Sequence, residues 1–200
     1  MFAMKTVLRH GVLACLLSTP ALAMDPACQP LIQSQRSMAN TPVHIFMTET
    51  RSWSKNLSGA AAGLGMGGSK RSEEISTGNA VYVLHDGKWI DMGASFAGAH
   101  GDPHDPEIKK AQEGKRCHAL PDEDVAGQPA AVYRENNPVL GIDTKIWISK
   151  RTHLPLKSEI TNKAGGPAMT SVTVSTYYYN DVRAPAGAIS MQQMIRERRH

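Results

Sequence analysis

The sequence is poor in cysteine and in aromatic residues, and it contains no long hydrophobic run. Only 6% of its 200 residues are aromatic, and three are cysteine. The most continuous apolar stretch, residues 11–17, is far shorter than the roughly 20 residues with which a helix crosses a bilayer core of about 30 Å. No later segment comes closer, so we expect no transmembrane segment in the mature chain.

Signatures of common enzyme classes are also missing. There is no G-x-S-x-G elbow for a serine nucleophile and no C-x-x-C pair for redox chemistry. Residues 63–68 satisfy G-x-G-x-x-G literally, but a dinucleotide site needs a strand before this motif and a helix after it, and Ser69-Lys70 is not the Gly-Lys of a P-loop. We interpret residues 57–70 as a flexible connection, with a movable flap over a cavity as the alternative. The sequence therefore predicts neither a catalytic residue nor a cofactor.

The charged residues do not indicate a nucleic-acid partner. The formal net charge is +4, from 22 Lys and Arg against 18 Asp and Glu. Nucleic-acid binding requires a basic patch or stripe, and the sequence shows no such clustering. Residues 186–200 follow the predicted domain as a basic C-terminal segment, and its last part, the tail Arg196-Glu197-Arg198-Arg199-His200, is locally basic. We interpret this tail as a frayed, solvated terminus, with a contact to anionic lipid headgroups as the alternative.

Potential metal ligands occur together in one loop: His100, Asp102, His104 and Asp105. A metal needs three or four converging ligands with oriented imidazoles, and a Gly/Pro-rich loop rarely holds them in place. Without a further ligand, for which His85 and His118 are candidates, we interpret the loop as solvated and predict no metal site. The acidic run Asp122-Glu123-Asp124 is interpreted as a polar turn rather than an acid/base pair, because adjacent strand residues point to opposite faces.

The N-terminus predicts export. Lys5 and Arg9 form a short positive region ahead of the apolar residues 11–17, and Ala21-Leu22-Ala23 gives the small-x-small pattern that signal peptidase recognises. We therefore expect residues 1–23 to be a signal peptide that is cleaved after Ala23. The mature protein then starts at Met24 in an exported, periplasmic compartment.

One of the three cysteines lies in the predicted signal peptide, and the other two lie in the mature chain. Cys15 leaves with the signal peptide, although Val12-Leu13-Ala14-Cys15 has the outline of a lipobox and lipidation of Cys15 stays an alternative. Cys28 and Cys117 remain as an even pair in an oxidising compartment, and we expect them to be bridged. Closing a loop of about 90 residues constrains the unfolded chain by roughly 4 to 5 kcal/mol on the entropic model.

Hydrophobic periodicity predicts two early helices and a series of short strands. The helices are expected over residues 26–39 and 106–114, the second with Asp105 as its N-cap. The strands are expected over residues 43–53, 73–77, 80–84, 88–92, 116–120, 130–135, 144–150, 156–161 and 171–180. Asp86-Gly87 between two apolar runs is a strong hairpin signal, and sequence neighbours are expected to pair antiparallel.

A meander of this length cannot stay open and flat. An open sheet leaves an apolar face and pairing edges exposed, so the sheet must close on itself or be covered on one face. The sequence therefore predicts an α+β fold, in which a strongly curved antiparallel sheet (a half barrel) covers one or two helices.

The C-terminal half resembles a known family. The runs AAVYRENN, IWISKRTHLPLKSEI and TVSTYYYNDVRAP within residues 130–185, together with the Asp-Gly-Lys-Trp hairpin, are similar to the periplasmic lipoprotein-carrier (LolA-like) superfamily. The resemblance implies a half barrel over residues 24–185 with a helical lid and an apolar interior that takes acyl chains. His153 stands where the family usually has Gly, and the arginine with which family carriers latch the lid cannot be placed, so no functional residue is transferred.

Alternation within strands indicates which side chains could contact a ligand. Ile146 and Ile148 share one face of their strand, and Lys145, Trp147 and Ser149 share the other. We expect the isoleucines to face the interior and the stem of Lys145 to lie along the Trp147 ring, because an unpaired lysine in an apolar cavity costs several kcal/mol. The predicted ligand-binding residues are Val43, Ile45, Met47, Ile146 and Ile148.

These patterns lead to one main hypothesis and two alternatives. The main hypothesis is a periplasmic, non-enzymatic protein that binds a lipid or another hydrophobic ligand in a half-barrel cavity, with lipid or lipoprotein transport as its context. The first alternative is an envelope protein-interaction or stress-sensor module with the same fold. The second is a metal-dependent hydrolase that uses the loop of residues 100–105.

Overall fold

The computed structural model describes residues 25–53, 68–93, 114–163 and 169–197. The helical segments are the 3-10 helix η1 (Pro26–Cys28), α1 (Gln29–Ala39) and α4 (Met191–Glu197). The strands are β1 (Val43–Trp53), β2 (Gly68–Ser76), β3 (Val81–His85), β4 (Lys88–Gly93), β5 (Arg116–Val125), β6 (Gln128–Asn137), β7 (Ile142–Ser149), β8 (Pro155–Asn162), β9 (Met169–Tyr178) and β10 (Ile189–Ser190). Together they make an α+β fold, as predicted.

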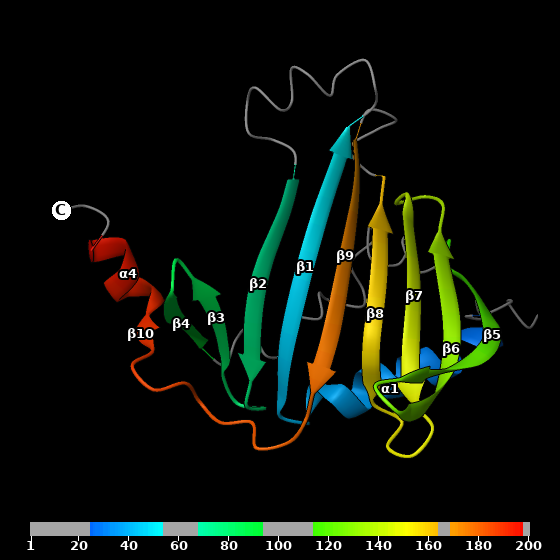
Figure 1. Ribbon diagram of the computed structural model, residues 1–200, viewed down its shortest axis with the longest axis horizontal. Coiled ribbons are helices and arrows are strands. Elements are labelled where there is room, and N and C mark those ends of the chain that lie inside the picture. The colour runs from blue at the N-terminus through cyan, green and yellow to red at the C-terminus, as the bar shows by residue number, and fades with distance from the viewer. Residues whose placement is uncertain (1–24, 54–67, 94–113, 164–168, 198–200) are drawn as a thin grey trace, which may run out of the picture.

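All ten strands belong to one sheet, in the order β10-β4-β3-β2-β1-β9-β8-β7-β6-β5. Two antiparallel meanders, β1 to β4 and β5 to β9, are joined side by side because β1 pairs with β9. The sheet is curved and unclosed (Figure 1), and among the described strands β5 and β10 are its two edges. The half barrel predicted from the sequence is thus confirmed, although it is two meanders rather than one.

Tight turns join the hairpins where the sequence supplies residues that tolerate positive φ. Asp86 and Gly87 have φ of 49° and 76° and connect β3 to β4, as the Asp-Gly signal predicted. Ala126 and Gly127 repeat this conformation between β5 and β6, with φ of 49° and 77°. His153, in the turn before β8, has φ of 59°. His153 thus adopts a left-handed backbone conformation, which glycine would adopt at a lower energetic cost.

Helix α1 packs on one face of the sheet, behind the lower ends of the strands in Figure 1. We call this side the α1 face and the other side the opposite face. On the α1 face, Cys28 and Leu31 form a buried cluster with Cys117 and Ile148. On the opposite face, a second buried cluster contains Ala130, Val132, Trp147 and Leu156. The sheet is therefore covered from both sides at its β5 to β8 end.

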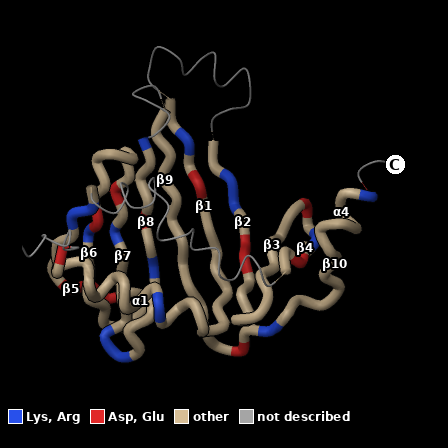
Figure 2. Tube along the Cα trace, turned by 180° about the vertical axis from the view of Figure 1, so that it is seen from behind, with Lys and Arg blue, Asp and Glu red and all other residues tan. Residues whose placement is uncertain are grey.

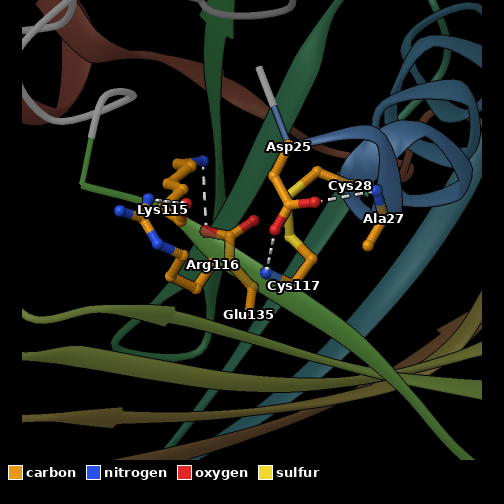
Figure 3. The surroundings of a disulfide bond; sticks show 7 residues. All are labelled: Asp25, Ala27, Cys28, Lys115, Arg116, Cys117 and Glu135. Carbon is orange, nitrogen blue, oxygen red and sulfur yellow. Dashed lines mark hydrogen bonds and ion pairs between the residues drawn. A yellow bond between two sulfur atoms is a disulfide. The ribbon is translucent and has the colours of Figure 1, made fainter. Parts of the chain in front are cut away.

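A disulfide ties the N-terminal segment to the edge strand. Cys28 and Cys117 are bonded, with their Cα atoms 5.1 Å apart, which confirms the predicted bridge. Figure 3 shows Asp25 beside it: its carboxylate accepts hydrogen bonds from the backbone N–H groups of Cys117, at 3.2 Å, and Ala27, at 3.0 Å. These bonds lower the pKa of Asp25, with the Cys117 bond as the larger cause. Asp25 therefore caps η1 and holds β5 with the same side chain.

Several predictions about elements need correction. The C-terminal residues contain β10 and α4, which the sequence did not predict, and Lys88 contacts Glu197 of α4 at 2.8 Å. The basic tail 196–200, expected to fray, lies mostly outside the described residues. Asp122-Glu123-Asp124, expected in a turn, lies within β5, because that strand continues past a register shift between Leu120 and Glu123. Strand β2 begins at Gly68 rather than at residue 73, since its charged first half pairs with β1. The predicted helix over residues 106–114 lies almost wholly outside the described residues.

Candidate functional site

The predicted ligand-binding residues lie on one face of the sheet. Register places Ile146 opposite Ser158, Ser158 opposite Ser175, and Ser175 opposite Met47, so these four side chains form one row across β7, β8, β9 and β1. Since Ile146 packs against the α1 cluster, the whole row belongs to the α1 face. Alternation places the other predicted residues on this face too: Val43, Ile45 and Ile148.

Burial along this face is graded. Val43 and Ile148 are buried, whereas Ile45, Met47 and Ile146 are only half-buried. Ile148 packs under α1 as a member of the buried cluster there. The partly accessible members of the predicted set are therefore Ile45 and Met47 on β1 and Ile146 on β7. Sequence reasoning could not separate these two groups, because alternation gives a face and not a depth.

A pocket opens between α1 and the sheet. It has a volume of about 180 Å³ and is lined by Pro30, Gln33, Ala131, Tyr133, Ile148, Ser149, Lys150 and His153. Its apolar wall comes from Tyr133 and Ile148, and its rim comes from the turn that carries Lys150 and His153. A larger hollow, of about 490 Å³, is formed at the neighbouring turns by Gly127, Gln128, Pro129, Ser149, Lys150 and Arg151. That hollow has no large apolar side chain, so the α1 pocket suits a hydrophobic ligand better.

Hydroxyl groups interrupt the apolar surface of the α1 face. The Ser158 and Tyr177 hydroxyls are hydrogen-bonded at 2.9 Å, and the Tyr179 hydroxyl donates to the Pro155 carbonyl oxygen at 2.7 Å. Burial raises the pKa of both tyrosines, so both hydroxyls are protonated at physiological pH. Ser34 of α1 is 2% exposed, and its Oγ has no partner within the described residues. The interior therefore offers hydrogen bonds beside its apolar groups.

One carboxyl group is placed among these side chains. Glu74 on β2 pairs in register with Ile45 on one side and Val83 on the other, which puts it on the α1 face. Burial raises its pKa, and within the described residues no cation compensates it. An uncompensated carboxylate in this position costs free energy, because burial disfavours its charged form. Sequence reasoning did not single out Glu74, because β2 is polar from Gly68 to Glu74.

The acidic side chains and potential metal ligands of the described residues form no metal site. No group of three His, Cys, Asp or Glu in the described ranges is arranged to bind a metal ion. The loop of residues 100–105 and the glycine motif up to residue 67 lie outside those ranges. Asp122 and Glu123 are engaged by lysines, Asp122 with Lys150 and Glu123 with Lys145 at 2.7 Å. These carboxylates are therefore structural ion pairs.

Charge and hydropathy add two observations. Figure 2 shows Lys and Arg interspersed with Asp and Glu along the strands, without a continuous basic stripe on the described part of the chain. Among the helices of the described segments, none is long and apolar enough to cross a membrane.

Comparisons with known proteins give structural neighbours only. No family model and no curated protein matches the sequence. Among solved structures, the chain is similar to the lipoprotein LppX of Mycobacterium tuberculosis, with 12% identity, 84% of this chain and 100% of that chain covered, and a TM-score of 0.42. It is also similar to the MucA/MucB complex of Pseudomonas aeruginosa, with 14% identity, coverage of 84% and 60%, and a TM-score of 0.39.

A third neighbour is a putative outer membrane lipoprotein-sorting protein domain from Vibrio parahaemolyticus, with 14% identity, coverage of 84% and 96%, and a TM-score of 0.32. Scores at this level reflect general architecture and identify no ligand or partner for this chain.

Proposed function

We propose that this protein is an exported, non-enzymatic binding protein that holds a lipid or another hydrophobic ligand on the α1 face. The observation that carries the proposal is the shared face of Ile45, Met47 and Ile146, which are half-buried and lie on the same side as the pocket beside α1. Apolar ligand sites combine such side chains with a few polar groups that fix orientation. The Ser158–Tyr177 hydroxyl pair is suited to that second role.

The half-open architecture supports reversible binding. An unclosed sheet leaves one side of the interior accessible, whereas a closed barrel would require a portal. The disulfide and Asp25 hold α1 to the β5 edge, so this end of the sheet stays rigid while a ligand is exchanged elsewhere on the face. This arrangement is suited to carriage of a lipid or lipoprotein between envelope sites.

The test combines ligand identification with a matched pair of variants. Purified protein is extracted with organic solvent and the extract analysed by mass spectrometry, and a fluorescent fatty acid is titrated into the delipidated protein. Met47→Asp places a charge on the α1 face and should abolish uptake. Thr48→Asp places the same charge on the adjacent residue, which points to the opposite face, and should leave uptake within about twofold of the wild type.

Two results would count against the proposal. The first is the absence of both co-purified lipid and fatty-acid binding in the folded protein. The second is equal loss of uptake in Met47→Asp and Thr48→Asp, provided that both variants keep the wild-type circular dichroism spectrum. The alternative function, an envelope interaction module, would then be tested by pull-down from envelope extracts.

A further inference from the structure

The opposite face of the sheet carries a group of aromatic side chains, which we call the Phe46 patch. It consists of His44 and Phe46 on β1, Trp89 on β4 and Tyr178 on β9. The His44 and Phe46 rings are 4.2 Å apart, and the Phe46 and Tyr178 rings are 5.4 Å apart and nearly perpendicular. The Trp89 ring meets His44 edge-on at 6.1 Å. Four rings from three strands thus form one continuous cluster.

This patch is exposed. Phe46 is 39% exposed and Tyr178 is 55% exposed, whereas His44 and Trp89 are half-buried. A carboxylate lies at its border: Glu73 Oε2 is 3.3 Å from His44 Nε2, and Glu73 pairs in register with Phe46. Contiguous exposed apolar surface on a folded domain commonly marks an interaction site.

The same face contains a buried aromatic ring, that of Trp147. We call Trp147 together with Lys145, Lys157 and Glu123 the Trp147 cluster. Lys145 and Lys157 each place Nζ 4.5 Å from the centroid of the Trp147 ring. Glu123 completes it, because its carboxylate accepts hydrogen bonds from Lys145 Nζ and from Trp147 Nε1, both at 2.7 Å. Trp147 is consequently 4% exposed. This cluster combines an aromatic ring, a carboxylate and cations on apolar stems.

The two groups lie in one row of the sheet. Register pairs Trp147 with Lys157, Lys157 with Thr176, Thr176 with Phe46, and Phe46 with Glu73, from β7 across to β2. Both ends of this row present aromatic rings and a carboxylate. In the described part of the chain a lysine covers the ring only at the Trp147 end. The Phe46 patch therefore has the components of the Trp147 cluster except for the cation.

We propose that the Phe46 patch binds an arginine or lysine side chain of a protein partner. Aromatic faces attract cations, Glu73 adds a negative charge, and the apolar stem of a basic side chain can cover Phe46 as those of Lys145 and Lys157 cover Trp147. A basic side chain is thus complementary to the patch in charge and in polarity.

The strength of such a contact indicates a polypeptide rather than a free small cation. One exposed cation–π contact changes an equilibrium only about two- to fivefold, so a free amine would not occupy an open sheet face at useful concentrations. When the basic residue is part of a polypeptide, the residues next to it in that chain can also contact the opposite face of the sheet and add to the affinity. The partner is therefore an envelope protein segment with at least one exposed Arg or Lys.

This site is separate from the one proposed for the hydrophobic ligand. Phe46 and Tyr178 point away from α1, whereas Ile45 and Met47, their neighbours in the sheet, point towards it. Loss of hydrophobic-ligand binding on the α1 face therefore need not affect binding of a basic side chain at the Phe46 patch, and the reverse also holds.

The experiment uses the full mature protein and a defined probe. A capped pentapeptide, Gly-Arg-Leu-Arg-Gly, is titrated into isotopically labelled protein while the aromatic ring resonances are followed by NMR. A second peptide carries citrulline in place of both arginines, which keeps the shape and removes the charge. We expect the arginine peptide to shift the Phe46 and Tyr178 signals and the citrulline peptide to bind at least fivefold more weakly.

Variants assign the effect to individual side chains. Phe46→Ala should weaken binding of the arginine peptide about fivefold or more, and Glu73→Gln about two- to fivefold. Thr48→Ala, on the same face of the same strand but outside the patch, is the matched control and should bind like the wild type. All three should take up the fluorescent fatty acid normally, which separates this test from that of the ligand site.

Four outcomes would overturn the proposal. Equal binding of the citrulline peptide would show that the patch recognises apolar surface and not a cation. Unchanged ring resonances at saturating arginine peptide would show that the patch is not the site. Phe46-dependent co-sedimentation with phosphatidylcholine vesicles, in the absence of peptide binding, would assign the patch to a lipid headgroup. A Phe46-dependent dimer in analytical ultracentrifugation would assign it to a second copy of the chain.

Discussion

The two faces of the sheet bury their side chains by different means. On the α1 face, a helix and a disulfide cover Ile148, and the contacts are apolar. On the opposite face, the side chains of Lys145 and Glu123 cover Trp147 without any helix, through a cation–π contact and hydrogen bonds. A sheet can therefore bury a large aromatic ring with its own long polar side chains, and only the first face needs a separate element to complete it.

The largest expected effect comes from putting a charge into the α1 face. Ile148→Asp buries a carboxylate beside Leu31, in a cluster of apolar side chains. The variant should lose about 3 to 5 kcal/mol of unfolding free energy or fail to fold. Thermal and urea melts measure this, with Ile148→Val as the matched control, which should cost about 0.5 to 1.5 kcal/mol. A folded Ile148→Asp protein with wild-type stability would contradict the helix-covered face.

Truncation of Trp147 tests the face that is covered by side chains. Trp147→Ala removes the buried ring and both lysine contacts, and should cost about 3 to 5 kcal/mol while leaving fatty-acid uptake unchanged in the folded fraction. Trp147→Phe keeps a ring but loses the hydrogen bond to Glu123, and should cost about 1 kcal/mol. If Trp147→Ala alone removed uptake from a stable protein, the ligand would lie on the opposite face.

Removal of the disulfide tests how α1 is held. The double variant Cys28→Ser/Cys117→Ser should lose about 2 to 5 kcal/mol, because the unfolded chain regains the freedom of a long loop. Ligand affinity should change little, since Asp25 and Leu31 still hold the segment against β5 and β7. A thiol assay on denatured, unreduced wild-type protein gives the control: two free sulfhydryls would contradict the bridge.

The smallest expected effect concerns Glu74 and depends on pH. Burial raises its pKa in the folded state above the ordinary value of 4.5, so the folded protein holds this proton more tightly than the unfolded chain. The free energy of unfolding therefore falls as the pH rises from the pKa of Glu74 in the unfolded chain to its higher pKa in the folded protein. The loss persists at neutral pH. Glu74→Gln should raise the melting temperature at pH 7 and lose that advantage below about pH 4. A variant that is less stable than the wild type at pH 7 would show that Glu74 has a stabilising partner.

Local signals in the sequence were sufficient for much of the fold. The boundaries of β1 were predicted correctly, and the alternation of Val43, Ile45 and Met47 with the residues between them supported the strand. The Asp86-Gly87 turn was predicted because its residues tolerate positive φ. The disulfide was predicted from an even pair of cysteines in a chain that we expect to be exported, and the structure confirms the bridge. Strand β5 was predicted too short, because Pro121 and three acidic residues read as a turn.

Properties that depend on pairing between distant strands were not predictable in the same way. Alternation gave Phe46 and Tyr178 a face within each strand, but only the pairing of β1 with β9 brings their rings together. The same pairing joins Met47 to the row that contains Ile146. A signal for the patch existed in the aromatic content of both strands, yet nothing in the sequence indicated the register between them.

The sequence by itself determined which residues alternate, where the hairpins turn, and which cysteines were available to form a bridge, because these depend on neighbours along the chain. Only the tertiary structure decided which apolar residues are covered, which charges are compensated, and which aromatic rings stay exposed. Burial and pairing are properties of the assembled sheet: Trp147 is covered because β5, β7 and β8 bring Glu123, Lys145 and Lys157 around it, whereas within the described residues nothing comparable covers Phe46.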